Sequence, residues 1–85
     1  MESRRSKSFK DCYDRLSRKE QRLVTKAYLL WRDNRNAKSL YFKPIGRGLW
    51  SARASDDLRA VCLKKDGVYL WIFVGDHGEY ERRFC

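Results

Sequence analysis

The longest apolar run of the chain lies in its last third, from Val68 to Val74. Seven consecutive β-branched, aromatic or large apolar residues predict a strand that is buried on both faces. Gly75-Asp76 ends this run, and Lys65-Asp66-Gly67 before it is typical of a hairpin turn. The sequence therefore predicts a β-hairpin whose second strand is deeply buried.

Two further segments alternate apolar and polar positions with the period of a half-buried strand. Residues 49–54 place Arg53 on the face opposite Trp50, and residues 58–63 place Arg59 on the face opposite Leu58. Pro44 favours an extended approach to the first of these strands, and Gly46-Arg47-Gly48 turns the chain. We expect three antiparallel strands in a meander.

Helical spacing dominates the first third of the chain. Apolar residues recur on one face between Phe9 and Leu16, and Ser17-Arg18-Lys19-Glu20 is typical of a capping box that starts a second helix. That helix should end near Asp33-Asn34. We therefore expect an α+β fold over residues 1–85, a single domain in which an N-terminal helical hairpin packs on a small antiparallel sheet. Residues 1–8 lack apolar alternation and should be flexible or a weak edge strand.

Charge narrows the possible partners. The chain has 85 residues and carries 20 Lys and Arg against 11 Asp and Glu, a net charge of +9. So basic a domain suits nucleic acid, an anionic membrane or an acidic protein. The longest apolar run is far shorter than the roughly 20 residues of a membrane span, so we expect no membrane partner. The basic N-terminus has no apolar segment of a secretory signal, and we expect a cytoplasmic protein.

The three cysteines, Cys12, Cys62 and Cys85, have no C-x-x-C spacing. Neither a disulfide framework nor a zinc site is indicated, and we expect no metal and no cofactor. Cys12 and Cys62 should be buried thiols and Cys85 exposed.

Two arginines are candidates for phosphate chemistry. Arg53 and Arg59 flank the short Asp56-Asp57 connection and can point to the sheet face that the helices leave open. Guanidinium groups there could bind phosphate oxygens and stabilise charge during transfer. The alternative is that both arginines pair with Asp56, Asp57 or Asp66.

His77 and Tyr80 follow the buried strand directly. A histidine titrates near neutrality and can act as base or acid, and a tyrosine can hydrogen-bond a scissile phosphate or stack on a base. The alternative is that His77 caps the strand end while Tyr80 closes the core.

Other basic residues widen the charged surface. Lys43, Arg47, Arg82 and Arg83 are candidates for nucleic-acid contacts, or are simply solvated. The basic residues of the second helix are expected to form a solvated stripe. They are Arg18, Arg22, Lys26 and Arg32.

The order of these parts resembles the RelE/ParE superfamily of toxins from bacterial toxin–antitoxin modules, over about Phe9 to Phe84. The segments that carry the resemblance are Leu49-Trp50-Ser51-Ala52-Arg53, Asp57-Leu58-Arg59-Ala60-Val61 and the stretch from Tyr69 to Tyr80 with its Gly75-Asp76-His77. The chain departs from the family in three respects. It shows no clear first strand, it has no glutamate near Arg53 in the groove strand, and it has little room for a helix beyond Tyr80.

The resemblance implies a toxin that an acidic antitoxin binds. For the RelE-like branch it implies an endoribonuclease that cleaves mRNA on the ribosome by metal-independent attack of the ribose 2′-OH. By position, Arg59 matches the arginine that stabilises the phosphate in the family, and Arg53 matches the partner of that arginine on the neighbouring strand. His77 matches the family's base, and Tyr80 matches its C-terminal tyrosine. Two alternatives stay open: a ParE-like inhibitor of DNA gyrase without enzymatic activity, and an inactive basic module that binds RNA or a protein partner.

Overall fold

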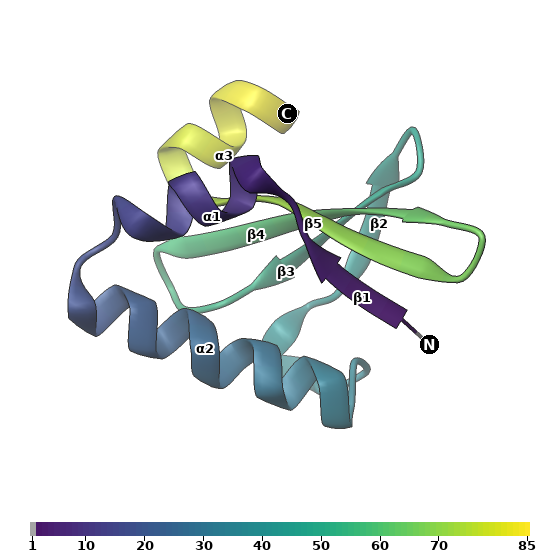
Figure 1. Ribbon diagram of the computed structural model, residues 1–85, viewed down its shortest axis with the longest axis horizontal. Coiled ribbons are helices and arrows are strands. Elements are labelled where there is room, and N and C mark those ends of the chain that lie inside the picture. Colours follow the sequence, from purple (N-terminus) through teal and green to yellow (C-terminus); the bar gives the residue numbers. More distant parts are fainter. Residues whose placement is uncertain (1) are drawn as a thin grey trace.

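Five strands form one mixed sheet in the computed structural model, which describes residues 2–85, in the order β1-β5-β4-β3-β2 (Figure 1). The strands are β1 (Glu2–Arg5), β2 (Lys43–Gly46), β3 (Leu49–Arg53), β4 (Leu58–Lys65) and β5 (Val68–Asp76). The expected meander is present as β3, β4 and β5, which pair antiparallel. The sheet has two more strands than that meander, and β4 is its middle strand.

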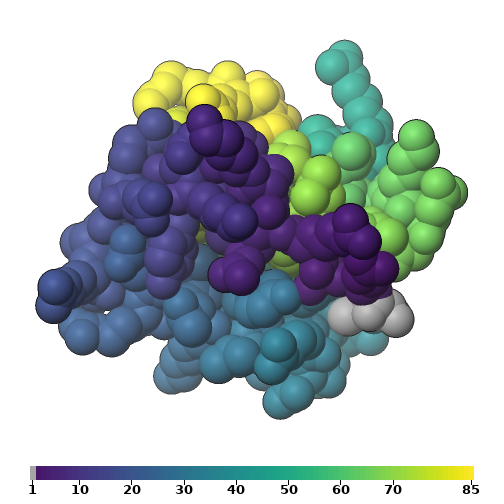
Figure 2. All heavy atoms as spheres, viewed as in Figure 1, coloured from purple at the N-terminus to yellow at the C-terminus, as the bar shows by residue number. Residues whose placement is uncertain are grey.

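The additional strands lie at the two edges of the sheet. Strand β1 pairs with β5 in parallel, with Ser3 opposite Tyr69, and β2 pairs antiparallel with β3. The side chains of β1 are mostly exposed, so its sequence has no apolar alternation to reveal it. Figure 2 shows this N-terminal segment in purple between α2 and the green β4–β5 hairpin. The α+β class is confirmed, and the sheet is mixed rather than purely antiparallel.

Three α-helices and one 3-10 turn complete the fold of residues 2–85. They are α1 (Lys7–Asp14), α2 (Arg18–Asp33), the turn η1 (Lys38–Leu40) and α3 (His77–Phe84). The capping box of α2 is present, since the Ser17 side chain accepts from Glu20 N and the Glu20 side chain accepts from Ser17 N. Helix α3 was not expected from the sequence. None of these helices is long and apolar enough to cross a bilayer.

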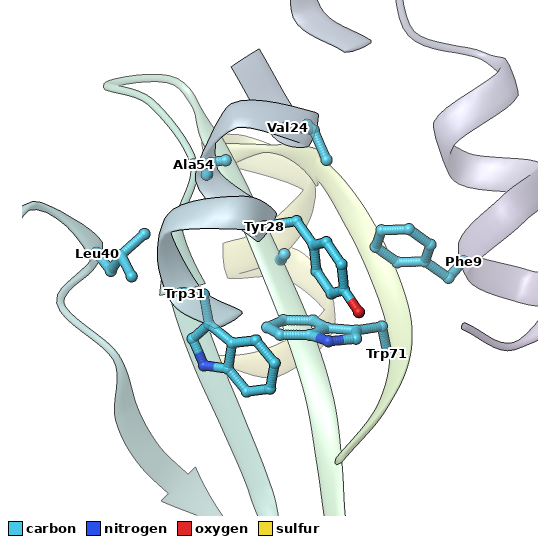
Figure 3. A pocket seen from close by; sticks show the side chains of 10 residues that line it. Phe9, Val24, Tyr28, Trp31, Leu40, Ala54 and Trp71 are labelled. Atoms are coloured by element: carbon cyan, nitrogen blue, oxygen red, sulfur yellow. The ribbon is translucent and has the colours of Figure 1, made fainter. Parts of the chain in front are cut away.

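Aromatic side chains join α2 to the sheet. The Trp31 ring is 1% exposed and meets the rings of Tyr69 and Trp71 edge-on, each at a centroid distance of 5.1 Å. Figure 3 shows Trp31 and Trp71 side by side, with Phe9 entering from α1. A cavity of about 30 Å³ remains among these side chains. Because it is small and apolar, this cavity is a packing gap of the core.

A bulge in β5 divides its side chains between the two faces of the sheet. Trp71 pairs with Cys62 but Phe73 pairs with Val61, which leaves Ile72 as an extra residue. Trp71 therefore faces α2, whereas Phe73 faces α3 and meets the Phe84 ring at 5.2 Å. Helices α2 and α3 lie on opposite sides of the sheet (Figure 1). The apolar run predicts a strand buried on both faces, and β5 is covered by α2 on one face and by α3 on the other.

Candidate active site

The two arginines of the sheet are direct cross-strand neighbours. Arg53 of β3 lies opposite Arg59 of β4, and Arg59 lies opposite Gly75 of β5. Directly opposite residues of antiparallel strands project from the same face, so both guanidinium groups belong to the α3 side of the sheet. Two cations so placed repel each other unless anions or carbonyl oxygens lie nearby.

Arg53 is held by one carboxylate and one aromatic ring. Its Nη2 donates to Asp56 Oδ1, and its guanidinium carbon lies 5.4 Å from the centroid of the Tyr41 ring. The Asp56 side chain is 89% exposed. An ion pair so open to water contributes between zero and about 1 kcal/mol, so an incoming phosphate can replace the carboxylate at small cost.

Arg59 is held by backbone carbonyls and by no carboxylate within residues 2–85. Its Nη1 donates to the carbonyl oxygens of Ser55 at 2.8 Å, of Asp56 at 3.1 Å and of Leu58 at 3.1 Å. The loop between β3 and β4 thus fixes one side of the guanidinium group. Its Nε and Nη2 donate to no described residue and remain available to an anion.

His77 is the first residue of α3 and follows β5 without a loop. The Asp76 side chain caps the helix by accepting from Glu79 N at 2.8 Å, and His77 N donates to the Asp57 carbonyl at 2.7 Å. The bond to Asp57 anchors the start of α3 to the loop that also holds both arginines. The sequence carries a signal for this helix, since Asp76 followed three residues later by Glu79 is a helix-start pattern.

The His77 imidazole has a carboxylate partner one helical turn along the chain. Its Nε2 lies 3.0 Å from Glu81 Oε1, and its ring stacks on Tyr80 with centroids 6.3 Å apart. The His77 side chain is half exposed. A carboxylate at this distance holds the imidazole ring in one orientation.

Tyr80 is both a core residue and a lining residue. Only 7% of it is exposed, and its ring lies 5.9 Å from that of Phe84. One side of the same residue nevertheless borders the open space in front of Arg59. The packing fixes the position of Tyr80 relative to the sheet.

These side chains meet around one cavity of about 280 Å³ on the α3 side of the sheet. Three of its lining residues are lysine or arginine, and none is aspartate or glutamate. The structure thus brings together the four residues taken from the sequence as catalytic candidates and one of the four nucleic-acid candidates. The lining consists of Tyr41, Lys43, Ser51, Arg53, Arg59, His77 and Tyr80.

Three of the predicted nucleic-acid contacts lie outside this cavity. Arg47 occupies the turn between β2 and β3, and Arg82 and Arg83 are exposed on α3. Arg83 has partners of its own, because its Nε lies 3.7 Å from Glu79 Oε1 and its guanidinium carbon 5.3 Å from the centroid of the Phe73 ring. These three arginines can contact only a ligand that extends beyond the cavity.

Tyr41 and Ser51 line the cavity but were not singled out in the sequence. Ser51 shares the face of Arg53 through the alternation of β3, and the pairing of Lys43 with Ser51 brings residue 41 beside Arg53. That register depends on a strand only four residues long. A Lys-Pro pair before two turn glycines is a weak signal for such a strand.

The cysteines lie away from the cavity, at the burial levels expected from the sequence. Cys12 and Cys62 are buried and Cys85 is exposed. Burial raises the pKa of the Cys62 thiol to about 12. Residues 2–85 contain no group of three His, Cys, Asp or Glu side chains arranged to hold a metal ion.

No family model matches this sequence, and no curated protein matches it significantly. Solved structures do match. YafQ from E. coli strain BL21(DE3) superposes with a TM-score of 0.73 at 12% identity, over 92% of this chain and 94% of YafQ. A YoeB/ParE toxin from Agrobacterium tumefaciens gives 0.69 at 19% identity, over 91% of this chain and 99% of the toxin.

A third match is the toxin–antitoxin complex RelBE2 from Mycobacterium tuberculosis. It has a TM-score of 0.60 at 15% identity and covers 89% of this chain and 90% of the matched chain. Identities this low establish a shared fold. The roles of individual residues have to be argued from the geometry of this chain.

Proposed function

We propose that this chain, which has the fold of the RelE/ParE toxin superfamily, is the toxin of a type II toxin–antitoxin module and cleaves mRNA. The observation that carries the proposal is the acid-free cavity in which Arg53, Arg59, His77 and Tyr80 meet. Such a cavity suits a phosphodiester better than a neutral or cationic substrate, because its lining offers donors and positive charge, and the Asp56 carboxylate that pairs with Arg53 is itself exposed and exchangeable.

The proposed reaction is an internal transesterification of RNA. The ribose 2′-oxygen bonds to the adjacent phosphorus, the bond from phosphorus to the 5′-oxygen breaks, and the products end in a 2′,3′-cyclic phosphate and a 5′-OH. Negative charge grows on the non-bridging oxygens as the new bond forms. Arg59, with its free Nε and Nη2, and the neighbouring Arg53 supply preorganised donors for that charge.

Protons move at both ends of this reaction. His77 takes the proton of the 2′-OH, and Glu81 stabilises the resulting imidazolium across the 3.0 Å contact. The departing 5′-oxygen takes up a proton, and Tyr80 and Lys43 are proton-bearing side chains of the same cavity. Tyr80 also holds the His77 ring in place through the stacked contact.

The proposed partners follow from charge. A net charge of +9 suits mRNA in its ribosomal setting in the cytoplasm, and it suits an acidic antitoxin that neutralises the same surface. The RelBE2 structure is a complex of such a toxin with its antitoxin, which supports an antitoxin partner for this chain.

The test is to incubate translating ribosomes with the protein and to map the ends of the mRNA. Wild type should cut, whereas Arg59→Ala and His77→Ala should each cut at least about a hundredfold more slowly. Arg22→Ala is the matched control, because it removes an exposed arginine of α2 outside the cavity and should cut at nearly the wild-type rate. Cleavage by both cavity variants at the wild-type rate would refute the site.

A second candidate is a gyrase inhibitor of the ParE type without enzymatic activity. It is favoured by the internal partners of Arg53 and Arg59, which suit a structural role for both side chains. Supercoiling assays separate the two functions, since gyrase inhibition without RNA cleavage would support this candidate. Absence of both activities and of toxicity on expression would support an inactive binding module.

A further inference from the structure

Tyr41 has no assigned role in the reaction, yet its side chain is unusually placed. It is 63% exposed, more than any other large apolar side chain among residues 2–85. Single exposed apolar residues are common on protein surfaces, so exposure alone does not indicate a function. Its backbone and its neighbours provide the further evidence.

The backbone of Tyr41 adopts a conformation that tyrosine rarely takes. Its φ angle is 44°, in the left-handed region, where it ends the η1 turn as its N–H donates to the Lys38 carbonyl at 3.2 Å. A residue with a Cβ reaches this region at an energetic cost. The cost brings no burial of the ring, and the turn instead presents Tyr41 at the mouth of the cavity.

The Tyr41 ring lies beside Arg53. The guanidinium carbon of Arg53 is 5.4 Å from the ring centroid, within the range of a cation–π contact. This contact sets the orientation of the ring before any ligand arrives. Most of the residue remains open to solvent.

Tyr41 and Arg53 also separate two hollows of the surface. One is the cavity that holds Arg59 and His77, and the other is a groove of about 690 Å³ between α2, η1 and the β3–β4 loop. Both hollows are lined by Tyr41 and Arg53, and the groove adds two lysines, Lys26 and Lys38, against one carboxylate, Asp56. A strand whose phosphate reaches Arg59 can therefore pass over the Tyr41 ring into a second basic hollow.

We propose that Tyr41 is a base-stacking residue, which binds the base of the nucleotide next to the scissile phosphate. The inference rests on the proposed RNA cleavage and adds a subsite to it. Open aromatic rings beside cationic side chains bind single-stranded nucleic acid because every base offers a π-face, whatever its identity. The subsite therefore binds a base without selecting its sequence.

The test is an NMR titration of the isotope-labelled protein with adenosine 5′-monophosphate and, separately, with ribose 5-phosphate. The two probes carry the same phosphate and differ in the base. Both should shift the backbone amides of Lys43 and Arg59. Only the nucleotide should shift the ring protons of Tyr41, and it should bind about tenfold more tightly.

Substitutions of Tyr41 test whether its ring causes the difference in affinity between the nucleotide and ribose 5-phosphate. Tyr41→Phe should keep it, whereas Tyr41→Leu should bring the affinity for the nucleotide down to that for ribose 5-phosphate. Tyr41→Asn should do the same in a chain at least as stable, because asparagine tolerates the left-handed region. Leu29→Ala, at an exposed site outside both hollows, should leave both affinities unchanged.

Two results would overturn the inference, and they differ in what they imply for the reaction. Equal affinities of wild type for the two probes would remove the base subsite while the phosphate site stands, and the exposed ring would then suit a protein partner. No shift of Lys43 or Arg59 with either probe would remove the phosphate site and the subsite together.

Discussion

Arg53 and Arg59 lie directly opposite each other in adjacent antiparallel strands, and one short loop supplies partners to both. The Asp56 carboxylate accepts from Arg53, and the carbonyls of Ser55 and Asp56 accept from Arg59. The loop thus reduces the repulsion between two neighbouring cations while leaving part of the Arg59 fork unbound. The Asp57 carbonyl of the same loop accepts from His77 N. One loop therefore positions three of the proposed catalytic residues.

Removing the Asp56 carboxylate tests whether the ion pair with Arg53 competes with substrate. Asp56→Asn should change the free energy of unfolding by less than about 1 kcal/mol, because the pair is exposed. It should also bind short RNA several-fold more tightly, since the guanidinium no longer has to exchange a carboxylate for a phosphate. Fluorescence anisotropy with labelled RNA measures the affinity, and Asp66→Asn in the β4–β5 turn is the control. Weaker RNA binding by Asp56→Asn would contradict the account.

Glu81→Gln tests the carboxylate beside His77. The variant should cleave several-fold more slowly, because the imidazolium formed during the reaction loses its charged partner. Its affinity for RNA should stay near the wild-type value, since Glu81 does not line the cavity. Glu79→Gln is the matched control, because that carboxylate lies beside Arg83 instead. Equal cleavage rates for both variants and the wild type would remove Glu81 from the mechanism.

Gly75 lies beside Arg59 where β5 approaches α3. A Cβ at this position would lie 2.8 Å from Phe73 Cζ, closer than side chains pack. Gly75→Ala should therefore lower the free energy of unfolding by about 1–3 kcal/mol, measured by urea denaturation. Gly78→Ala is the comparison, because its Cβ would meet nothing closer than 3.4 Å and alanine favours the helix. An equal loss of stability in both variants would contradict the close packing at Gly75.

The thiols should differ sharply in reactivity. A maleimide should label exposed Cys85 in the folded protein, and buried Cys12 and Cys62 only on unfolding, as timed mass spectrometry can show. The pKa of Cys62 rises from 9.0 to about 12 in the folded state. Its contribution to stability is therefore complete below pH 9 and declines as pH rises towards 12, because only the unfolded chain ionises readily there. Native labelling of Cys62 as fast as Cys85 would contradict this burial.

The sequence predicts those parts of the fold that local patterns encode. The Ser17–Glu20 capping box and the Asp66-Gly67 turn are local signals, and both are present in the structure. Strand alternation placed Arg53 and Arg59 on one face, which the register confirms. Each of these features depends on residues within a few positions of one another.

The remaining features depend on contacts between distant segments. Strand β1 is held by backbone bonds to β5, while its side chains face solvent and carry no pattern. Helix α3 does carry a local start signal in Asp76 and Glu79, but it follows β5 without a loop, so the strand pattern runs directly into the helix. Tyr41 reaches the site through a left-handed backbone at the end of η1, which the residue type does not predict.

The central claim, attack by the ribose 2′-OH in the cavity of Arg59 and His77, is tested most directly by the chemistry of the cut ends. Matched mRNAs would carry either ribose or 2′-deoxyribose at the mapped cleavage position, in a translation mixture with the wild-type protein. The account predicts fragments ending in a 2′,3′-cyclic phosphate from the ribose substrate, and no cut at the deoxy position. Equal cleavage of both substrates, or 3′-OH ends from the ribose substrate, would contradict it.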